Sequence, residues 1–221
     1  MTEQQTLIPV EEQLPSGVTD KDLDDLTKSS SFLPQLRVYG ASSTLVKEGS
    51  FPMGHLGLYI TSGNVLDLGE QVDSLVTACR PRAGIVSGDS PISYYDMASP
   101  SFVETKERAM AKEEGFMVGL EYLLYFPSII RWGLFFMGNP TLRRESANVK
   151  ALLGCAATIK VKFINPSTSK YSWHGVSAYQ CTTPFDLPDM KEIEGMREEF
   201  RHPIDSSVEL DTDSKSGGRE R

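Results

Sequence analysis

The sequence predicts an α+β fold: a mostly antiparallel β-barrel, OB-like, with two inserted helices and flexible acidic ends. Short stretches that alternate apolar and polar residues recur through the middle of the chain. Two stretches of helical spacing are inserted among them, whereas a parallel α/β fold would alternate a helix with each strand. The composition also changes near Ser31 and again after Pro184, where polar, acidic sequence meets the apolar middle.

These composition changes divide the chain into three parts. We expect residues 1–30 to form a disordered acidic N-terminal arm, 31–185 a β-rich OB-like core domain, and 186–221 a short helix and an acidic disordered C-terminal tail. The chain has 221 residues and 39% hydrophobic content, which suits one globular domain. Its net charge is −8, yet residues 131–170 contain seven Lys or Arg and a single Glu. Acidic ends therefore flank a core that has one basic stretch.

Alternation predicts the strands of the core in order. LRVYG (36–40) is the first, since its apolar and polar residues alternate. A hairpin is expected over 54–69, with its turn at 62–64. The remaining expected strands are 73–84, 90–96, 120–126, 129–138, 157–164 and 171–179.

Capping residues predict the two inserted helices. The first begins at Ser99 or Ser101 and ends at Gly115. The second begins after Asn139, a good N-cap, and ends by Gly154. Each helix has apolar residues at a spacing that gives one buried stripe.

Two further short helices are expected outside the core. PDMKEIEGMREEF (188–200) has apolar residues at helical spacing, interrupted at Gly195. This helix either docks on the core or stands free. Residues 18–28 could form another within the otherwise disordered arm.

Cations and aromatic residues come together near the end of the core. Lys160 and Lys162 point outward from one strand, and Tyr171 and Trp173 lie in its expected partner strand. Proteins that bind single strands hold phosphates with cations and stack bases on aromatic rings, so this surface predicts nucleic-acid binding. The alternative is a solvated lysine face, which discourages edge-to-edge aggregation, over a core Trp173. The preceding helix and the following loop extend the candidate surface with Arg143, Arg144, Lys150 and Lys170.

Further candidate cations lie outside this region. Arg80 and Arg82 bracket a proline, which keeps the backbone extended, and we expect a loop that presents both guanidiniums to phosphates. A soluble loop without a ligand is the alternative. Arg37 and Tyr39 are expected to share the outward face of their strand. Arg131 is expected to be exposed at the start of an aromatic-rich strand.

Motifs for metals, cofactors and catalysis are missing from the sequence. No pair of Cys or His has zinc-ligand spacing, and there is no glycine-rich phosphate loop or GxSxG elbow. We therefore expect no metal, no cofactor and no catalytic residue. His174 is the best isolated acid–base candidate, with a structural histidine as the alternative. An enzyme that used core carboxylates would draw on Asp67, Glu70, Asp73, Asp89 and Asp96.

Membrane insertion and export are not expected. The sequence has no run of about 18 apolar residues, as a transmembrane helix would need. The polar, acidic N-terminus is unlike a signal peptide. We therefore expect no membrane partner and a place in the cytosol of a host cell.

Several stretches of the middle resemble a family of small phage-encoded, mostly uncharacterised proteins. They are FLPQLRVYGASSTLVKEGSFPMGHLGLY (32–59), VDSLVTACRPRAG (72–84), FFMGNPTLRRESANVKALLGCAATIKVKF (135–163), and YSWHG (171–175) with CTTPFDLP (181–188). The resemblance covers about residues 31–190 and implies binding of single-stranded DNA. The C-terminus departs from phage replication binding proteins with acidic tails, because it ends in SKSGGRER. That ending argues against recruitment of replication enzymes by the tail.

The sequence therefore predicts a protein that binds single-stranded DNA without sequence specificity during phage replication or recombination. Replication or recombination proteins are candidate partners, and a homo-oligomer is allowed. One alternative is a structural or interaction protein of a virion or phage-made assembly. Another is an enzyme acting on nucleotides or DNA through the core carboxylates.

Overall fold

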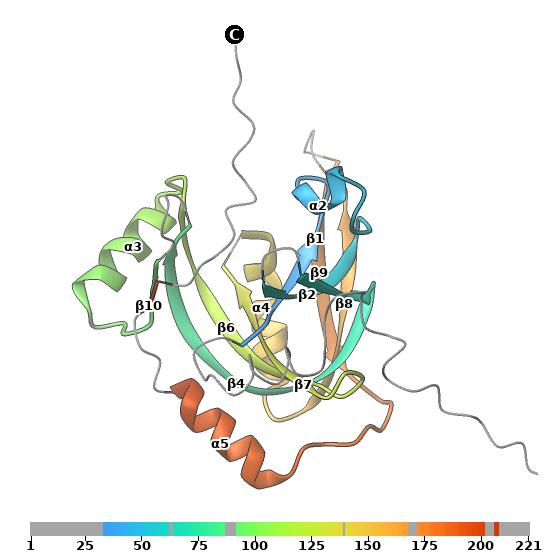
Figure 1. Cartoon of the computed structure of the whole chain (residues 1–221). Helices are drawn as coiled ribbons and strands as arrows, with labels where there is room; N and C mark the ends of the chain where they lie inside the picture. Colours follow the sequence, from blue (N-terminus) through green and yellow to red (C-terminus); the bar gives the residue numbers. More distant parts are fainter. Residues whose placement is uncertain are drawn as a thin grey trace, which may run out of the picture.

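The computed structural model describes residues 33–61, 64–86, 92–138, 140–167, 172–201 and 206–207. They form an α+β fold in which a strongly curled, mostly antiparallel sheet makes a half-barrel (Figure 1). The strands are β1 (Gln35–Tyr39), β2 (His55–Thr61), β3 (Asn64–Gly69), β4 (Gln71–Ile85), β5 (Ile92–Tyr94), β6 (Phe116–Phe126), β7 (Arg131–Met137), β8 (Ala156–Ile164), β9 (Trp173–Gln180) and β10 (Ser206–Ser207). The helices are α2 (Thr44–Lys47), α3 (Pro100–Met110), α4 (Pro140–Ala151) and α5 (Met190–Arg201).

The long strand β4 organises the sheet. The strand order is β10-β5-β4-β6-β7-β1-β2-β3, and β8 pairs with β4 and β9. With 15 residues, β4 is long enough to pair with β8 along its first part and with β5 along its last part, both on the edge opposite β6. The pairing of β1 with β7 is parallel, and the other recorded pairings are antiparallel.

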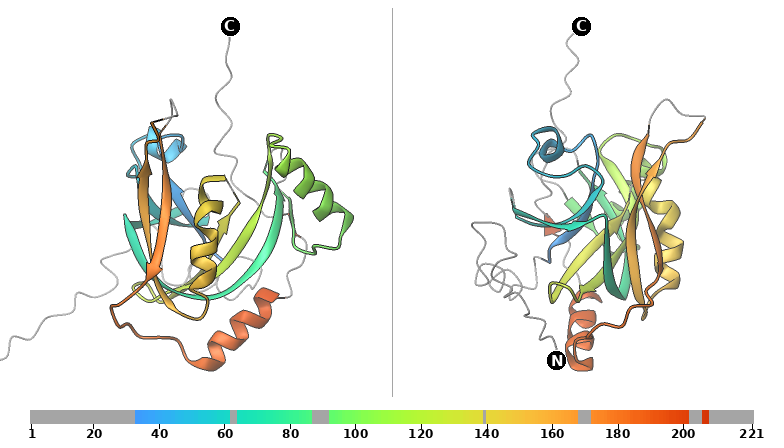
Figure 2. Two further views of the ribbon diagram at one scale, coloured as in Figure 1. Left: turned by 180° about the vertical axis from the view of Figure 1, so that it is seen from behind. Right: turned by 90° about the vertical axis from the view of Figure 1, so that its right-hand side faces the viewer.

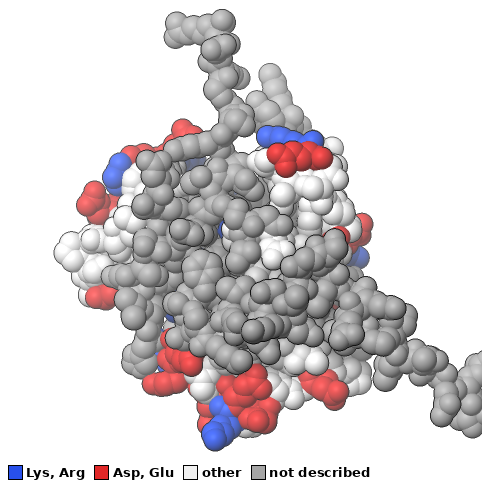
Figure 3. All heavy atoms as spheres, viewed as in Figure 1, with Lys and Arg blue, Asp and Glu red and all other residues white. Residues whose placement is uncertain are grey.

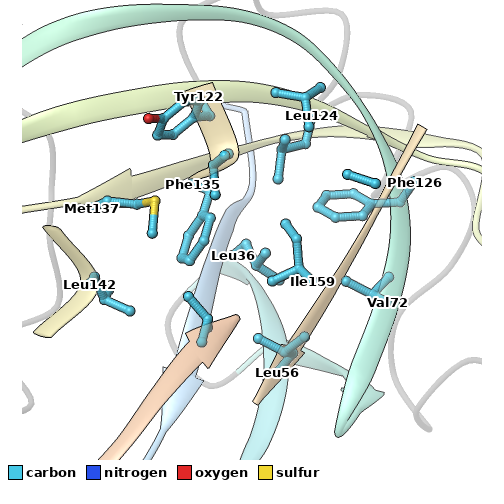
Figure 4. Close-up of a cluster of buried hydrophobic side chains, with 14 of the residues drawn as sticks. Leu36, Leu56, Val72, Tyr122, Leu124, Phe126, Phe135, Met137, Leu142 and Ile159 are labelled. Carbon is cyan, nitrogen blue, oxygen red and sulfur yellow. The ribbon is translucent and has the colours of Figure 1, made fainter. Parts of the chain in front are cut away.

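The concave face of the half-barrel holds the main core. Tyr122, Leu124 and Phe126 alternate along β6 and point into this core, and each is 0% exposed. Phe135 from β7 and Ile159 from β8 meet them there (Figure 4). Because the side chains of a strand alternate between its faces, the intervening residues of β6 lie on the convex face.

Helix α4 fills the hollow of the half-barrel. It lies between the β8–β9 hairpin and the curved β4 and β6 (Figure 2). Leu142 and Val149 join the main core, and the hydroxyl of Tyr122 donates to the Ser146 carbonyl at 2.6 Å. Burial raises the pKa of the Cys79 thiol on β4, and the ammonium of Lys150 partly offsets the rise. Lys150 therefore extends on this concave side of the sheet.

Helix α5 covers the convex face. Ile193 and Phe200 pack on a second cluster, to which Tyr125 and Trp132 belong. The indole N–H of Trp132 donates to Glu192 at 2.7 Å, which ties the start of the helix to β7. The expected helix thus docks on the core, and it continues without interruption through Gly195.

The α+β class and the mostly antiparallel sheet are confirmed. The two inserted helices are α3 and α4, and Ser99 is the N-cap of α3, accepting from the Phe102 amide at 3.2 Å. The sheet is a half-barrel to which the described residues contribute ten strands, rather than the expected barrel. Two helices accompany the inserted pair: the short α2, which was not expected, and α5, which matches the helix expected over 188–200. The expected helix over 18–28 lies outside the described residues, and no described helix has the length and apolar character to cross a membrane.

Candidate nucleic-acid interface

The β8–β9 hairpin extends past the rest of the sheet. Pairing of β8 with β4 ends at Lys160, which lies opposite Gln71. Pairing with β9 continues to Ile164, opposite Trp173. We call residues 161–164 and 173–176 the arm. Figure 2 shows the hairpin upright at one side of the half-barrel.

The register gives the hairpin two different faces. Ala157, Ile159 and Val176 point into the main core. Lys160 and Lys162 point the other way, as does Tyr179, which lies opposite Thr158. We call this side, with Lys160, Lys162, Trp173 and Tyr179, the outer face.

The outer face combines exposed lysines with an accessible ring. Lys160 and Lys162 are exposed, and neither forms an ion pair with a described residue. Tyr179 is 47% exposed. It was not selected from the sequence, because it lies at the polar end of its strand. Its period-2 relation to Trp173 was the available signal. Of the predicted juxtaposition, the structure describes Trp173, which lies on the same face as Lys160 and Lys162.

Trp173 fits both interpretations of the sequence in part. It shares the outer face with the two lysines, but it is half-buried. Its indole nitrogen is buried and has no hydrogen-bond partner in the described part of the chain. Tyr179 therefore offers the more accessible stacking surface. Lys170 and Tyr171 lie outside the described residues.

The cations of α4 do not join this face. Arg144 and Lys150 are exposed, and Arg143 is half-buried with its Nη1 3.7 Å from the Met110 sulfur at the end of α3. Because α4 packs on the concave side, the β8–β9 layer separates these cations from Lys160 and Lys162. The prediction of one continuous basic surface is wrong. After α4 the chain turns into β8, whose Lys160 and Lys162 lie on the face of the hairpin away from the helix.

Arg80 and Arg82 are not on a loop, so that prediction is also wrong. Both lie within β4 and point to the convex face, where they share the carboxylate of Glu121. The Arg80 Nη2 is 2.6 Å from Oε2, and the Arg82 Nη1 is 2.6 Å from Oε1. The side chains of Arg82 and Glu121 are 1% and 0% exposed. Pro81 is tolerated between the arginines because, among the strands that the structure describes, β4 has only β6 beside it there.

Aromatic rings complete the arginine cluster. The Arg80 guanidinium lies 4.1 Å from the ring centroids of both Tyr95 and Phe200, and it donates to the Phe200 carbonyl at 2.6 Å. Arg82 lies 4.6 Å from the Phe136 ring. Burial, with the charge of Glu121, raises the pKa of Tyr95. With α5 docked, neither arginine is open to a phosphate.

The other candidates are dispersed. Tyr39 is buried against Phe51, with ring centroids 4.4 Å apart, so its expected exposure is wrong. Arg37, on the same face, lies 4.1 Å from the Tyr59 ring. Arg131 is half-buried at the β6–β7 turn, which Figure 1 places at the end of the molecule opposite the arm tip. None of the three extends the outer face.

The opposite face of the arm carries a residue that the sequence did not single out. Phe163 alternates with core residues, yet it is 58% exposed. Its ring centroid lies 5.2 Å from that of His174, directly across the hairpin. His174 was selected as an acid–base candidate, but its neighbours here are a ring and the glycine-containing segments at Gly40 and Gly54.

The core carboxylates serve local structure. Asp67 accepts from the Gly69 amide and contacts the His55 ring nitrogen at 2.9 Å. Asp73 accepts from the Thr158 hydroxyl, and Asp96 accepts from the Ala98 amide. Asp89 lies outside the described residues, among which no three His, Cys, Asp or Glu gather in a way that could hold a metal ion.

Comparison with protein-family models, with curated proteins and with solved structures gave no match.

Proposed function

We propose that the protein binds single-stranded DNA without sequence specificity through the outer face, in phage replication or recombination. The observation that carries this proposal is the placement of Lys160 and Lys162, exposed and without a described ion pair, on the same face as Tyr179. Phosphates would contact the lysines while bases stack on the ring, which requires no chemistry on the nucleic acid. A curled sheet with a projecting hairpin also suits the OB-like mode of binding.

Charge is distributed in favour of this location. Residues 146–185 contain no Asp or Glu, so the whole hairpin lacks carboxylates. Acidic side chains gather over α5 at the lower end of the molecule (Figure 3), where Glu194, Glu198 and Glu199 are exposed. A polyanion is therefore repelled at one end of the hairpin and attracted at the other.

Replacing both lysines tests the phosphate contacts. Lys160→Ala with Lys162→Ala should weaken binding of a labelled oligothymidine and flatten the salt dependence. Each lost contact to a single strand changes the slope of log K against log salt by about 0.7, so the double variant should lose about 1.4. Fluorescence anisotropy over a salt series measures both quantities.

A matched control removes the same charge from another surface. Lys106 of α3 and Lys112 after it are also exposed. Their double replacement by Ala should leave the slope at the parental value. Equal slopes in both double variants would refute the assignment to the outer face, and a parent that binds no single strand would refute the function.

Tyr179→Ala tests stacking separately from charge. Loss of one stacking platform should weaken binding by about 1–3 kcal/mol and leave the salt slope unchanged. Tyr179→Phe keeps the ring and should bind like the parent. The exposed position makes misfolding a minor concern, which a melting curve of each variant checks. Parental affinity in Tyr179→Ala would exclude this ring as a platform.

A further inference from the structure

We infer that the arm carries a second base-stacking site on its opposite face, formed by Phe163 against His174, so that one single strand wraps around the free edge of the arm. This inference rests on the proposed function, and it adds a feature of the ligand. A strand that contacts both faces of a hairpin must be flexible, so the ligand is single-stranded rather than duplex. DNA duplexes stay straight over about 150 base pairs, far more than the width of a hairpin.

The exposure of Phe163 follows from the length of the hairpin. Ile159 and Val161 precede it on the same face, and they pack in or against the main core. Phe163 comes after the last pairing of β8 with β4, where the half-barrel no longer covers that face. A ring that is 58% exposed on such a face has apolar surface available to a ligand.

His174 fixes the ring of Phe163 from one side. It lies opposite Phe163 in the hairpin, with the two rings inclined by 51°. The other side of His174 meets Gly54, where an added Cβ would lie 3.2 Å from the imidazole Nε2. Gly54 has a φ of +83°, so glycine is favoured there for its backbone as well as for the space. His174 is thus held between backbone and ring, and Phe163 presents a preorganised surface.

The edge between the two faces is an unpaired strand edge. Among the described residues β9 pairs with β8 alone, so its other edge carries no paired strand. The arm is free of carboxylates on both faces, and Lys162 directly precedes Phe163. The occupant that fits these features is a flexible polyanion with aromatic bases.

The dependence of binding on oligonucleotide length tests the inference. Single OB folds bind about 4–16 nucleotides, so oligothymidines of about 4 and about 16 nucleotides are suitable probes. The shorter probe stays on the lysine-bearing outer face, whereas the longer one reaches Phe163. Phe163→Ala should weaken binding of the longer probe about fivefold to 100-fold and change that of the shorter less than about twofold. Phe163→Tyr should bind both probes like the parent.

His174 is a positioning residue in this arrangement. His174→Ala should show the same selective loss for the longer probe, and His174→Phe, which keeps a ring against Phe163, should restore it. A loss of fold would instead weaken both probes, and thermal unfolding of each variant identifies it.

Two outcomes overturn the inference while leaving the proposed function intact. One is parental affinity of Phe163→Ala for the longer probe when Tyr179→Ala is weakened. The other is an equal loss for both probes in a folded Phe163→Ala, because Phe163 would then belong to the same subsite as the lysines. Duplex binding as tight as single-strand binding would overturn the inference together with the single-strand preference of the proposed function. A parent that binds neither probe removes the proposed function itself.

Discussion

Glu121→Gln should lower the free energy of unfolding by about 3–5 kcal/mol, the usual cost of breaking a buried ion pair from one side. The carboxylate is 0% exposed and is shared by Arg80 and Arg82, whose side chains are 15% and 1% exposed. A glutamine keeps one acceptor oxygen, but its NH2 group faces the other arginine as a donor, and two positive charges are left without a counter-charge. Guanidinium-induced unfolding, with the slope m compared between variants, measures the loss.

A surface pair provides the matched control. Glu113, which follows α3, forms an ion pair with Arg108 of that helix, and both side chains are more than 40% exposed. Glu113→Gln should change the unfolding midpoint far less, because water screens exposed pairs. Parental stability in Glu121→Gln would contradict the buried cluster.

Removing all three charges distinguishes the cost of an unpaired charge from the value of the cluster. Replacement of Arg80 and Arg82 by Met together with Glu121 by Leu leaves no buried charge to compensate. Such replacements are often neutral or stabilising when the volume is kept. The triple variant should therefore be more stable than Glu121→Gln. If it is less stable, the hydrogen bond of Arg80 to Phe200 in α5 contributes more than the charges cost.

This cluster also shows where sequence reasoning stops. Arg80 and Glu121 are direct cross-strand neighbours, yet they are 41 residues apart in the chain. The pattern around Pro81 is local, and it describes an extended backbone correctly without showing what lies beside it. Burial here depends on β6 and on α5, and no local pattern reports either contact. Two arginines that appear ready for phosphates are therefore structural.

Local signals succeeded where the structure is decided locally. The alternation of 157–164 placed Lys160 and Lys162 on the outer face, and Ser99 was a candidate cap of α3. The hairpin β2–β3 also follows its turn residues, since Thr61 pairs with Asn64. In each case the side-chain period or a cap sets the outcome within a few residues.

Phe163 illustrates the opposite case. Alternation assigns it to the core face, which is correct, but the exposure of that face depends on where the neighbouring strand β4 ends. The same limit applies to α4, whose cations follow the hairpin lysines closely in sequence but lie across the sheet from them. Proximity in the chain does not determine the side of a sheet.

Phe200→Ala should cost about 3–5 kcal/mol, as expected for a large aromatic residue truncated in a core. Phe200 is 4% exposed, packs in the second cluster, and lies against the Arg80 guanidinium. Residues 181–189, which connect β9 to α5, have no helix or strand, so the helix is held by its own contacts with the convex face. The loss should therefore appear first as local detachment of α5.

Trypsin can report this detachment. Arg197 lies on α5 with its Nε bonded to the Thr77 carbonyl at 2.9 Å, so docking protects the bond that follows it. In Phe200→Ala the cleavage after Arg197 should become fast under native conditions, while the half-barrel remains intact. Met190→Ala, at a position 62% exposed on the same helix, should keep the parental rate. Equal protection of Arg197 in the parent and in Phe200→Ala would mean that α5 does not depend on this ring. Fast cleavage would establish that contacts at the C-terminal end of α5 keep it docked over Trp132 and Tyr125. The hydrogen bond between Glu192 and Trp132 at the start of the helix would then be insufficient to hold it.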